Sequence, residues 1–353
     1  MAKKLMKGNE AIGEAAIQAG ARYYFAYPIT PQTEVAEYLA RRMPEVDGVF
    51  LQAESELGAS NMIFGAASSG KRVFTSSSSP GISLMSEALS YITCAELPTV
   101  FINVCRAGPG LGGILPSQGD YFQAAHASGH GDFHLLVLAP ATVQEAVEHM
   151  MIAFDLADKY RNPVMIFADG LIGQMMEPVD FDAVKTGTPA DHSDWAATGA
   201  KGRSPHIVKT LYLNPADNEK HNIHLAEKYE KMRVEVRHEI YGDLDKATVL
   251  ITAFGTAARV CKTAIDQLAE QGIHVALFRP ITLFPFPQDA LREAAGSKSI
   301  KTLLSVEMNN GQMVEDVKNY THEAKPVHFF GRQGGIVPSP EEVVEAVKKL
   351  VRN

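Results

Sequence analysis

The stretch RVFTSSSSPGISLMSEALSYITCAELPTVFINVC, residues 72–105, decides the fold. It opens with an apolar run of strand length at 72–76 and closes with a longer one at 99–105. Between them, residues 82–93 carry apolar side chains at helical spacing, after a Ser-Pro-Gly turn. Strand, helix and strand in this order predict two parallel strands joined by a crossover helix.

The same alternation continues on both sides of this unit. Strand-like runs occur at 23–27 and 48–52 before it, and at 134–139 and 164–167 after it. Apolar runs of this length between helices indicate a parallel sheet covered on both faces. We therefore predict an α/β domain over residues 1–180.

Local start signals predict where the helices of this domain begin. Asn9 is a candidate cap for a helix that runs to Ala19, and Pro31 suits the first turn of a helix over 32–42. Small residues predict a further helix over 55–69, and an amphipathic pattern predicts one over 143–159.

Residues 181–245 differ in composition, with frequent Pro, Asp, Lys and His and few strand-like runs. We interpret this stretch as a linker that wraps a surface and contains a helix near 222–239. Strands and helices alternate again over 246–353, which predicts a second, doubly wound α/β domain. The predicted fold class is thus α/β, with two domains.

Bulk properties exclude several classes of protein. The 353 residues carry a net charge of -8, which argues against a non-specific nucleic-acid binder. No window approaches about 18 uninterrupted apolar residues, so we expect no membrane span. Three widely spaced cysteines and no C-x-x-C motif indicate reduced thiols in a cytoplasmic protein. Any iron–sulfur cluster would therefore belong to another chain.

Three polar side chains follow predicted strands, where open α/β sheets bind ligands. Thr30 and Arg106 both suit a carboxylate, and Glu56 lies in the first turn of a predicted helix. Each has a structural alternative. Thr30 could cap its own helix, Glu56 could complement the helix dipole, and Arg106 could form a structural ion pair.

Other sequence patterns give weaker indications of function. Gly108, Gly110 and Gly113 match G-x-G-x-x-G, but no helical pattern follows them, so we reject a dinucleotide site. His126, His130 and His134 are spaced by four, yet glycines interrupt any helix between them, so we predict no metal site. The serines at 76–79 lack the surroundings of a hydrolase nucleophile.

Several short motifs in order resemble the alpha subunit of 2-oxoacid:ferredoxin oxidoreductases, and within that family the branched-chain 2-oxoisovalerate type. The motif Arg-Pro-Ile-Thr-Leu-Phe-Pro-Phe-Pro at 279–287 resembles the second domain of the same subunit. The resemblance covers nearly the whole chain. The motifs of the first domain are Tyr-Pro-Ile-Thr-Pro at 27–31, Glu-Ser-Glu-Leu-Gly-Ala at 54–59, Thr-Ser-Ser-Ser-Ser-Pro-Gly at 75–81, Arg-Ala-Gly-Pro at 106–109 and Gln-Gly-Asp at 118–120.

The resemblance implies roles for particular residues. Glu56 matches the glutamate that activates the aminopyrimidine of thiamine diphosphate, with Glu54 as a nearby rival. Thr30 and Arg106 match residues that contact the substrate carboxylate. Ser79, Pro80 and Gly81 fall in the stretch that lies near the cofactor. The two domains would be a pyrimidine-binding domain and a transketolase-C-terminal-like domain.

The resemblance also implies partners. The Gly-Asp-Gly motif that holds the diphosphate and Mg²⁺ is absent, because Ala168-Asp169-Gly170 lacks the first glycine. A beta subunit would supply that motif together with iron–sulfur clusters, beside a gamma subunit and a ferredoxin-like delta subunit. The implied reaction is oxidative decarboxylation of a 2-oxo acid to acyl-CoA and CO2, with coenzyme A as co-substrate and ferredoxin as electron acceptor. The alternatives are a pyruvate- or 2-oxoglutarate-specific member, a non-redox thiamine enzyme and a purely structural subunit.

Overall fold

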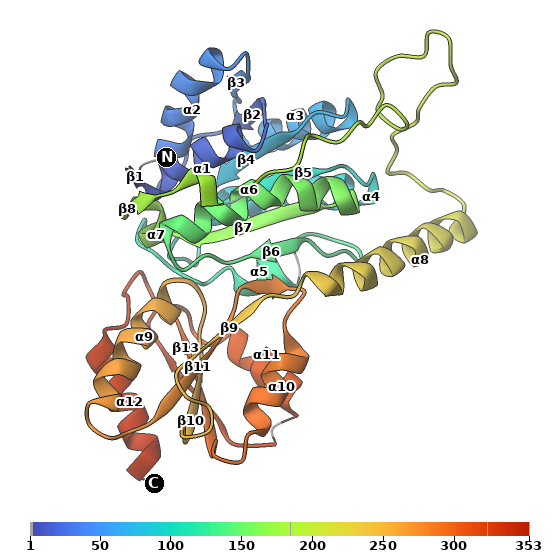
Figure 1. Ribbon diagram of the computed structural model, residues 1–353. Coiled ribbons are helices and arrows are strands. Elements are labelled where there is room, and N and C mark those ends of the chain that lie inside the picture. Colours follow the sequence, from blue (N-terminus) through green and yellow to red (C-terminus); the bar gives the residue numbers. More distant parts are fainter. Residues whose placement is uncertain (1–2, 127, 184, 323, 353) are drawn as a thin grey trace.

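Two α/β units stacked one above the other make up the protein (Figure 1). The computed structural model describes residues 3–126, 128–183, 185–322 and 324–352. The N-terminal unit contains a seven-stranded sheet, and the C-terminal unit a five-stranded sheet. The α/β fold class predicted from the sequence is confirmed.

The seven-stranded sheet has the order β12-β6-β7-β5-β4-β2-β3 and is parallel except for β12. Buried apolar runs such as Thr99–Cys105 form its central strands, because both faces of the sheet are covered. Its strands are β2 (Tyr23–Ala26), β3 (Val49–Gln52), β4 (Val73–Ser77), β5 (Thr99–Cys105), β6 (Leu136–Leu138), β7 (Pro163–Asp169) and β12 (Thr282–Phe284).

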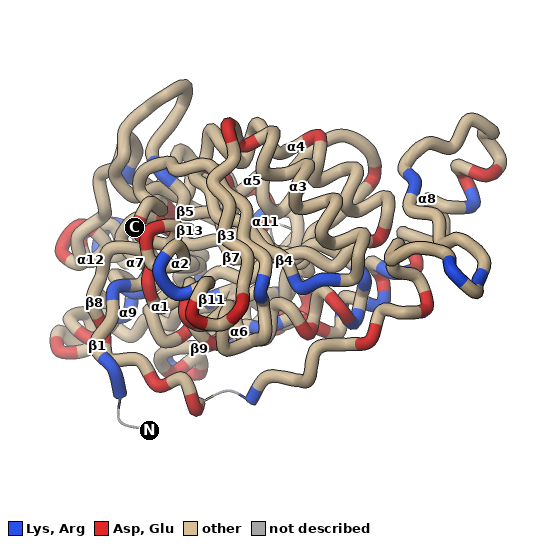
Figure 2. The backbone as a smooth tube through the Cα atoms, turned by 90° about the horizontal axis from the view of Figure 1, so that it is seen from above, with Lys and Arg blue, Asp and Glu red and all other residues tan. Residues whose placement is uncertain are grey.

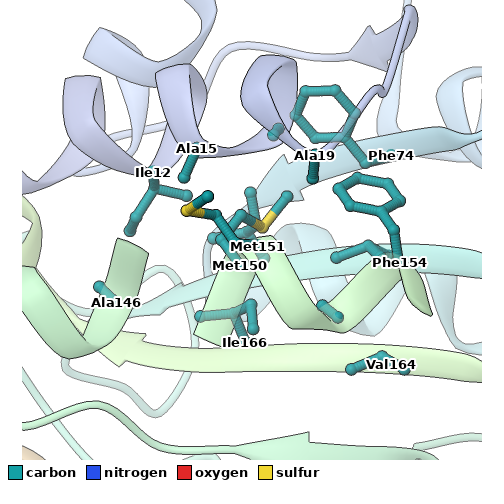
Figure 3. Close-up of a cluster of buried hydrophobic side chains, with 14 of the residues drawn as sticks. Ile12, Ala15, Ala19, Phe74, Ala146, Met150, Met151, Phe154, Val164 and Ile166 are labelled. Carbon is teal, nitrogen blue, oxygen red and sulfur yellow. The ribbon is translucent and has the colours of Figure 1, made fainter. Parts of the chain in front are cut away.

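One face of this sheet is covered by α1, α2 and α6, and the other by α3, α4 and the second unit. Figure 3 shows Ile12 and Ala15 of α1 close to Met150 and Met151 of α6. A short antiparallel pair, β1 (Lys4–Lys7) with β8 (Met176–Val179), lies beside them. The helices are α1 (Gly8–Gln18), α2 (Thr33–Glu45), α3 (Glu56–Ser68), α4 (Ser79–Cys94), α5 (Tyr121–Ala125), α6 (Val143–Tyr160) and α7 (Gly170–Gln174).

The five-stranded sheet has the order β14-β13-β10-β11-β9, with β9 antiparallel to β11. Its strands are β9 (His238–Tyr241), β10 (Val249–Thr252), β11 (Val275–Pro280), β13 (Thr302–Glu307) and β14 (Val327–Gly331). Its helices are α9 (Gly255–Ala269), α10 (Gln288–Gly296), α11 (Met313–Thr321) and α12 (Pro340–Arg352).

The connecting segment contains the 3-10 turn η1 (Phe181–Ala183), the long helix α8 (Pro215–Met232) and the turn η2 (Arg233–Glu235). The helix predicted over 222–239 is therefore wrong at its C-terminal end, where β9 begins at His238. Asn214 accepts a hydrogen bond from the N–H of Ala216 and so begins α8 earlier than the sequence suggested.

Asn9 does not cap α1, contrary to the sequence prediction. The helix begins at Gly8, and Asn9 is buried inside it, so its side chain points across the fold instead. Its amide donates to the carbonyl oxygen of Pro31 at 2.7 Å and to Glu34 at 2.9 Å.

The two units share buried contacts. Strand β12 leaves the second unit to pair with β6 of the first sheet, and Phe254 and Phe278 belong to the same buried cluster as Phe101. Polar contacts also join the two units across their interface. Gln118 of the first unit donates to the carbonyl oxygen of Phe254 of the second unit at 2.8 Å. Figure 2 shows Lys and Arg interspersed with Asp and Glu along the backbone.

One contact across this interface predicts a pH dependence. Asp316 of α11 accepts hydrogen bonds from Tyr121 at 2.6 Å and from His126 at 2.7 Å. The hydrogen bond with Asp316 raises the pKa of His126 above its ordinary 6.5, although burial opposes the shift. The contact of protonated His126 with Asp316 therefore stabilises the fold fully below pH 6.5. This contribution is lost as the pH rises through the pKa of His126 in the folded state.

Thermal unfolding measures this loss of stability between pH 5.5 and 8.5. The interval extends roughly one unit or more on each side of an ordinary histidine pKa. We expect the unfolding temperature of the wild type to fall across this interval more steeply than that of His126→Gln. Parallel curves for the two proteins would contradict the assignment.

Candidate functional site

The candidate site lies where four neighbouring strands of the first sheet end. In the order β5-β4-β2-β3, the carboxyl ends lead into Arg106, the turn at 78–81, the loop 27–31 and the start of α3. Parallel strands present these ends at one edge, which is where α/β sheets bind ligands. The sheet therefore brings the segments that carry Thr30, Glu56, the turn at 79–81 and Arg106 to one edge.

Glu56 occupies the first turn of α3. Ser55 caps that helix by accepting a hydrogen bond from the N–H of Gly58 at 3.0 Å, and the helix lies within the predicted range 55–69. The side chain of Glu56 is buried, with only 6% of the residue exposed, yet no described residue hydrogen-bonds or pairs with its carboxylate. Its oxygens are not among the fully enclosed atoms without a partner, so the carboxylate opens to the outside and is free to bind a ligand. The rival Glu54 is exposed and lies against Gly58 of its own helix.

Gly81 lets this carboxylate lie close to the backbone of α4. A Cβ at position 81 would come within 2.7 Å of Glu56 Oε1 and 2.0 Å of Ser77 Oγ. The hydroxyl of Ser77 is itself buried and has no hydrogen-bond partner among the described residues. Only glycine therefore allows the side chains of Glu56 and Ser77 to approach the backbone at position 81 this closely.

A side chain at position 81 should displace Glu56 and Ser77 and so impair function, and thermal unfolding of the variant separates this from a loss of folding. We expect Gly81→Ala to lower activity by about 10²-fold, because a catalytic group displaced by a fraction of an ångström to an ångström loses that much. Gly65→Ala is the matched control, since an exposed helical glycine with no atom within 4 Å of the added Cβ should be neutral or stabilise by about 0.5–1 kcal/mol. Full activity in Gly81→Ala would show that this close approach is not required.

The turn after β4 lies between Glu56 and Arg106 at the sheet edge, since β4 is next to β5. Pro80 lies in the first turn of α4 and Ser79 begins that helix. The hydroxyl of Ser79 accepts from the backbone N–H of Arg106 at 3.0 Å and donates to its carbonyl oxygen at 3.2 Å. Its hydroxyl is therefore engaged within the protein, and its place near the cofactor stays a prediction.

Arg106 is buried but is not neutralised by the chain. Its guanidinium donates to the carbonyl oxygens of Thr30 at 2.9 Å and Leu111 at 3.1 Å, while Nε has no partner. No carboxylate among the described residues pairs with it, so the alternative of a structural ion pair is wrong. A buried cation held only by carbonyl groups favours an anionic ligand, because an unpaired buried charge is expensive.

Thr30 does not cap α2, because that helix begins three residues later at Thr33. It is exposed, and its side chain forms no hydrogen bond with a described residue. The loop around it is fixed through its carbonyl oxygens instead. Arg106 holds that of Thr30, while Asn9 and Gln174 hold that of Pro31 at 2.7 and 3.3 Å.

The structure adds supporting residues that the sequence analysis did not find. Gln32 accepts from Ser76 at 2.6 Å, and Ser76 in turn contacts the hydroxyl of Tyr24 at 2.6 Å. Asn103 accepts from the backbone of Ser79 at 3.2 Å and donates to Asp120 at 2.9 Å. The available signal was their position: each is a polar residue within or beside an apolar strand.

Residues weighed for a metal have other contacts. His126 bonds Asp316, and the ring of His134 stacks on Phe284 with centroids 4.0 Å apart. Asp169 caps α7 and accepts from the hydroxyl of Thr256 at 3.0 Å. Its carboxylate is therefore used in joining the two units, and burial raises its pKa.

Comparison with protein families matches both units. The model described as "Pyruvate flavodoxin/ferredoxin oxidoreductase, thiamine diP-bdg" matches residues 14–241. The model described as "Pyruvate:ferredoxin oxidoreductase core domain II" matches residues 247–343.

Similar proteins cover the whole chain. The "Ketoisovalerate oxidoreductase subunit VorB" of Methanothermobacter thermautotrophicus is 43% identical over 99% of this chain and 98% of its own length. The "2-oxoglutarate synthase subunit KorA" of Archaeoglobus fulgidus is 35% identical over 99% of both chains.

Solved structures agree with these relatives. The 2-oxoglutarate:ferredoxin oxidoreductase of Magnetococcus marinus, solved with 2-oxoglutarate, coenzyme A and succinyl-CoA bound, matches with a TM-score of 0.88 and 28% identity. The match covers 98% of this chain but 65% of the length of that one. A split-gene transketolase in an inactive beta4 tetramer matches in fold, with a TM-score of 0.60 and 14% identity over 98% of both chains.

The fold and the sheet-edge site together define a subunit of a thiamine-diphosphate-type oxidoreductase. The chain belongs to the 2-oxoacid:ferredoxin oxidoreductase family, as an alpha-type subunit. No helix in the described ranges is long and apolar enough to cross a membrane.

Proposed function

We propose that this chain is the alpha subunit of an enzyme that oxidatively decarboxylates a branched-chain 2-oxo acid to acyl-CoA and CO2, with electrons passing to ferredoxin. The observation that carries the proposal is that two largely buried charged side chains, both without an ion-pair partner among the described residues, lie along one sheet edge. Glu56 has no partner for its carboxylate, and Arg106 has no carboxylate for its guanidinium. A cofactor ring and a substrate carboxylate would satisfy them respectively.

Thiamine diphosphate, when bound, supplies the carbon nucleophile and the electron sink for decarboxylation. Glu56 would hold a proton between its carboxylate and the ring nitrogen of the pyrimidine, which promotes the imino form that acts as the internal base. Gly81 and Ser77 would border the same ring. Ser79 and Pro80 would fix the turn that carries Gly81.

Arg106 would orient the 2-oxo acid by its carboxylate, because its guanidinium has no carboxylate partner among the described residues, and the Thr30 hydroxyl would assist it. Since Arg106 also fixes the carbonyl oxygens of Thr30 and Leu111, it would hold the surrounding loops in place. Leu111, Ile114 and Leu115 of the loop after Arg106 are exposed and could border an aliphatic substrate chain. The relatives named for ketoisovalerate favour a branched chain.

A partner chain would complete this site. Strand β3 is an open edge, and Tyr27, Val49, Leu51 and Leu57 around the start of α3 are between 37% and 48% exposed. Apolar groups gathered beside an incomplete site support its burial by another subunit. We propose that a beta subunit covers this edge and holds the diphosphate, Mg²⁺ and iron–sulfur clusters.

We further propose the other subunits and the co-substrate of the enzyme. A gamma subunit and a ferredoxin-like delta subunit would complete the enzyme, with coenzyme A as acyl acceptor. Cys94, Cys105 and Cys261 are free thiols, in keeping with a cytoplasmic enzyme.

The test is an assay of benzyl-viologen reduction by the co-expressed subunits, with coenzyme A and one 2-oxo acid at a time. We expect the highest kcat/KM with 3-methyl-2-oxobutanoate, compared with pyruvate and 2-oxoglutarate. A preference for 2-oxoglutarate would overturn the substrate assignment, since relatives named for that acid are 32–35% identical. Release of CO2 without viologen reduction would indicate a non-redox thiamine enzyme.

A further inference from the structure

The segment between β8 and α8 projects from the body and returns along its side (Figure 1). Its last part, residues 206–213, is extended but belongs to neither sheet. We call it the strap. It lies apart from the edge of β3, and nothing in the site described above uses it.

The strap alternates strictly between two faces. Its even-numbered residues are half-buried, whereas Ile207, Lys209, Leu211 and Leu213 are exposed. The three outward apolar residues are 79%, 68% and 85% exposed. A period of two is the pattern of an extended strand with one face packed and the other open.

The inner face is anchored at each step. His206 bonds the carbonyl oxygen of Ala196 at 2.9 Å, and Val208 packs against the buried cluster of the first unit. The thiol of Cys94 donates to the carbonyl oxygen of Thr210 at 3.9 Å. The ring of Tyr212 stacks on that of His221, with centroids 4.7 Å apart. The outer row is therefore presented on a fixed backbone, not on a loose linker.

Apart from the carbonyl oxygen of Thr210, which accepts from Cys94, the strap backbone has no hydrogen-bond partner among the described residues. Within the described part of the chain, no backbone–backbone hydrogen bond joins any of residues 204–213. An extended, anchored segment with unpaired N–H and C=O groups is a template for an added strand. Its outward apolar row would supply the side-chain contacts of such a pairing.

The positive charge of the strap and the residues before it indicates what kind of polypeptide would bind there. Residues 201–213 contain Lys201, Arg203 and Lys209 and no acidic residue, so they carry +3 within a chain of net charge -8. Pairing of the strap with the strap of a second copy would bring these like charges together. An acidic, apolar segment of a different chain would be attracted instead.

We propose that the strap is a docking site for an extended segment of a different polypeptide, rich in apolar and acidic side chains, which adds to it as a β-strand. The proposal needs from the proposed function only that the enzyme contains a second kind of chain. It makes no use of the thiamine site.

Hydrogen exchange of backbone amides tests the pairing in the full chain alone and in the co-expressed assembly, both without substrate. We expect the amides of residues 207–213 to exchange about tenfold or more slowly in the assembly. Equal exchange in the two samples would overturn the proposal. Slowing that appears in the isolated chain as its concentration is raised would also overturn it, in favour of self-association. Because no turnover is measured, an inactive enzyme would leave this result unaffected.

Substitution tests the outer row separately. The triple variant Ile207→Ser, Leu211→Ser and Leu213→Ser should weaken assembly about tenfold or more, measured by sedimentation of the co-expressed subunits, because each removes exposed apolar area needed only for docking. Val234→Ser is the matched control, since Val234 is 74% exposed and lies in η2. Unchanged assembly in the triple variant, or equal weakening in the control, would contradict the inference.

Discussion

Replacing Glu56 with Gln should lower turnover of the assembled enzyme about 10³-fold, the scale of a lost proton-transferring group. The amide keeps the shape and burial of the side chain but cannot exchange a proton with a ring nitrogen. Because no described residue bonds the carboxylate, its loss should disturb no contact within the chain. We therefore expect the free energy of unfolding to change by less than about 1 kcal/mol, the effect of one charge in a helix's first turn.

Glu54→Gln is the matched control for this experiment. Both residues are acidic and lie at the start of α3, but Glu54 is exposed. Its variant should keep activity within about a factor of two, as expected for a surface substitution. Should Glu54→Gln lose activity while Glu56→Gln keeps it, the two residues would exchange roles. Near-normal activity in both variants would favour a purely structural subunit.

Arg279→Met should give the largest loss of stability, about 3 kcal/mol, because it removes a buried guanidinium that holds two half-buried carboxylates of different units. Arg279 is 2% exposed and donates two hydrogen bonds to Glu145 of the first unit, at 2.7 and 2.8 Å. It also donates to Glu239 at 2.6 Å. The loss should appear in urea unfolding at neutral pH.

The exposed pair of Arg292 with Asp289 provides the control. Arg292→Met should cost less than about 0.5 kcal/mol, since surface ion pairs contribute little. A comparable loss in both variants would show that burial of the Arg279 cluster is not the cause.

The cost of Arg279→Met should also depend on pH. Burial alone would raise the pKa of Glu145, but its hydrogen bonds with Arg279 outweigh this and lower the pKa below its ordinary 4.5. A lowered folded pKa contributes stability above pH 4.5 that is lost as the pH falls through the folded value. The difference between wild type and variant should therefore shrink on acidification, and a constant difference would contradict this reason.

Local sequence patterns predicted most of the fold. The strands of the first sheet predicted from apolar runs lie within a few residues of their predicted places, as with the strand predicted over 48–52 and observed at Val49–Gln52. The site residues Thr30, Glu56 and Arg106 were found because each follows an apolar run, and parallel strands necessarily end at one edge. Their catalytic roles stay predictions.

Contacts between distant residues were not predictable in this way. The pairing of β12 with β6, the reach of Asn9 to Pro31 and the isolation of the Arg106 charge all depend on which side chains meet after folding. Periodicity reports only which face of an element is buried, because it reflects neighbours along the chain. The sequence alone thus determined the elements and the edge where chemistry gathers. The tertiary structure alone decided which polar groups are left without partners there, since hydrogen-bond satisfaction is a property of the packed fold.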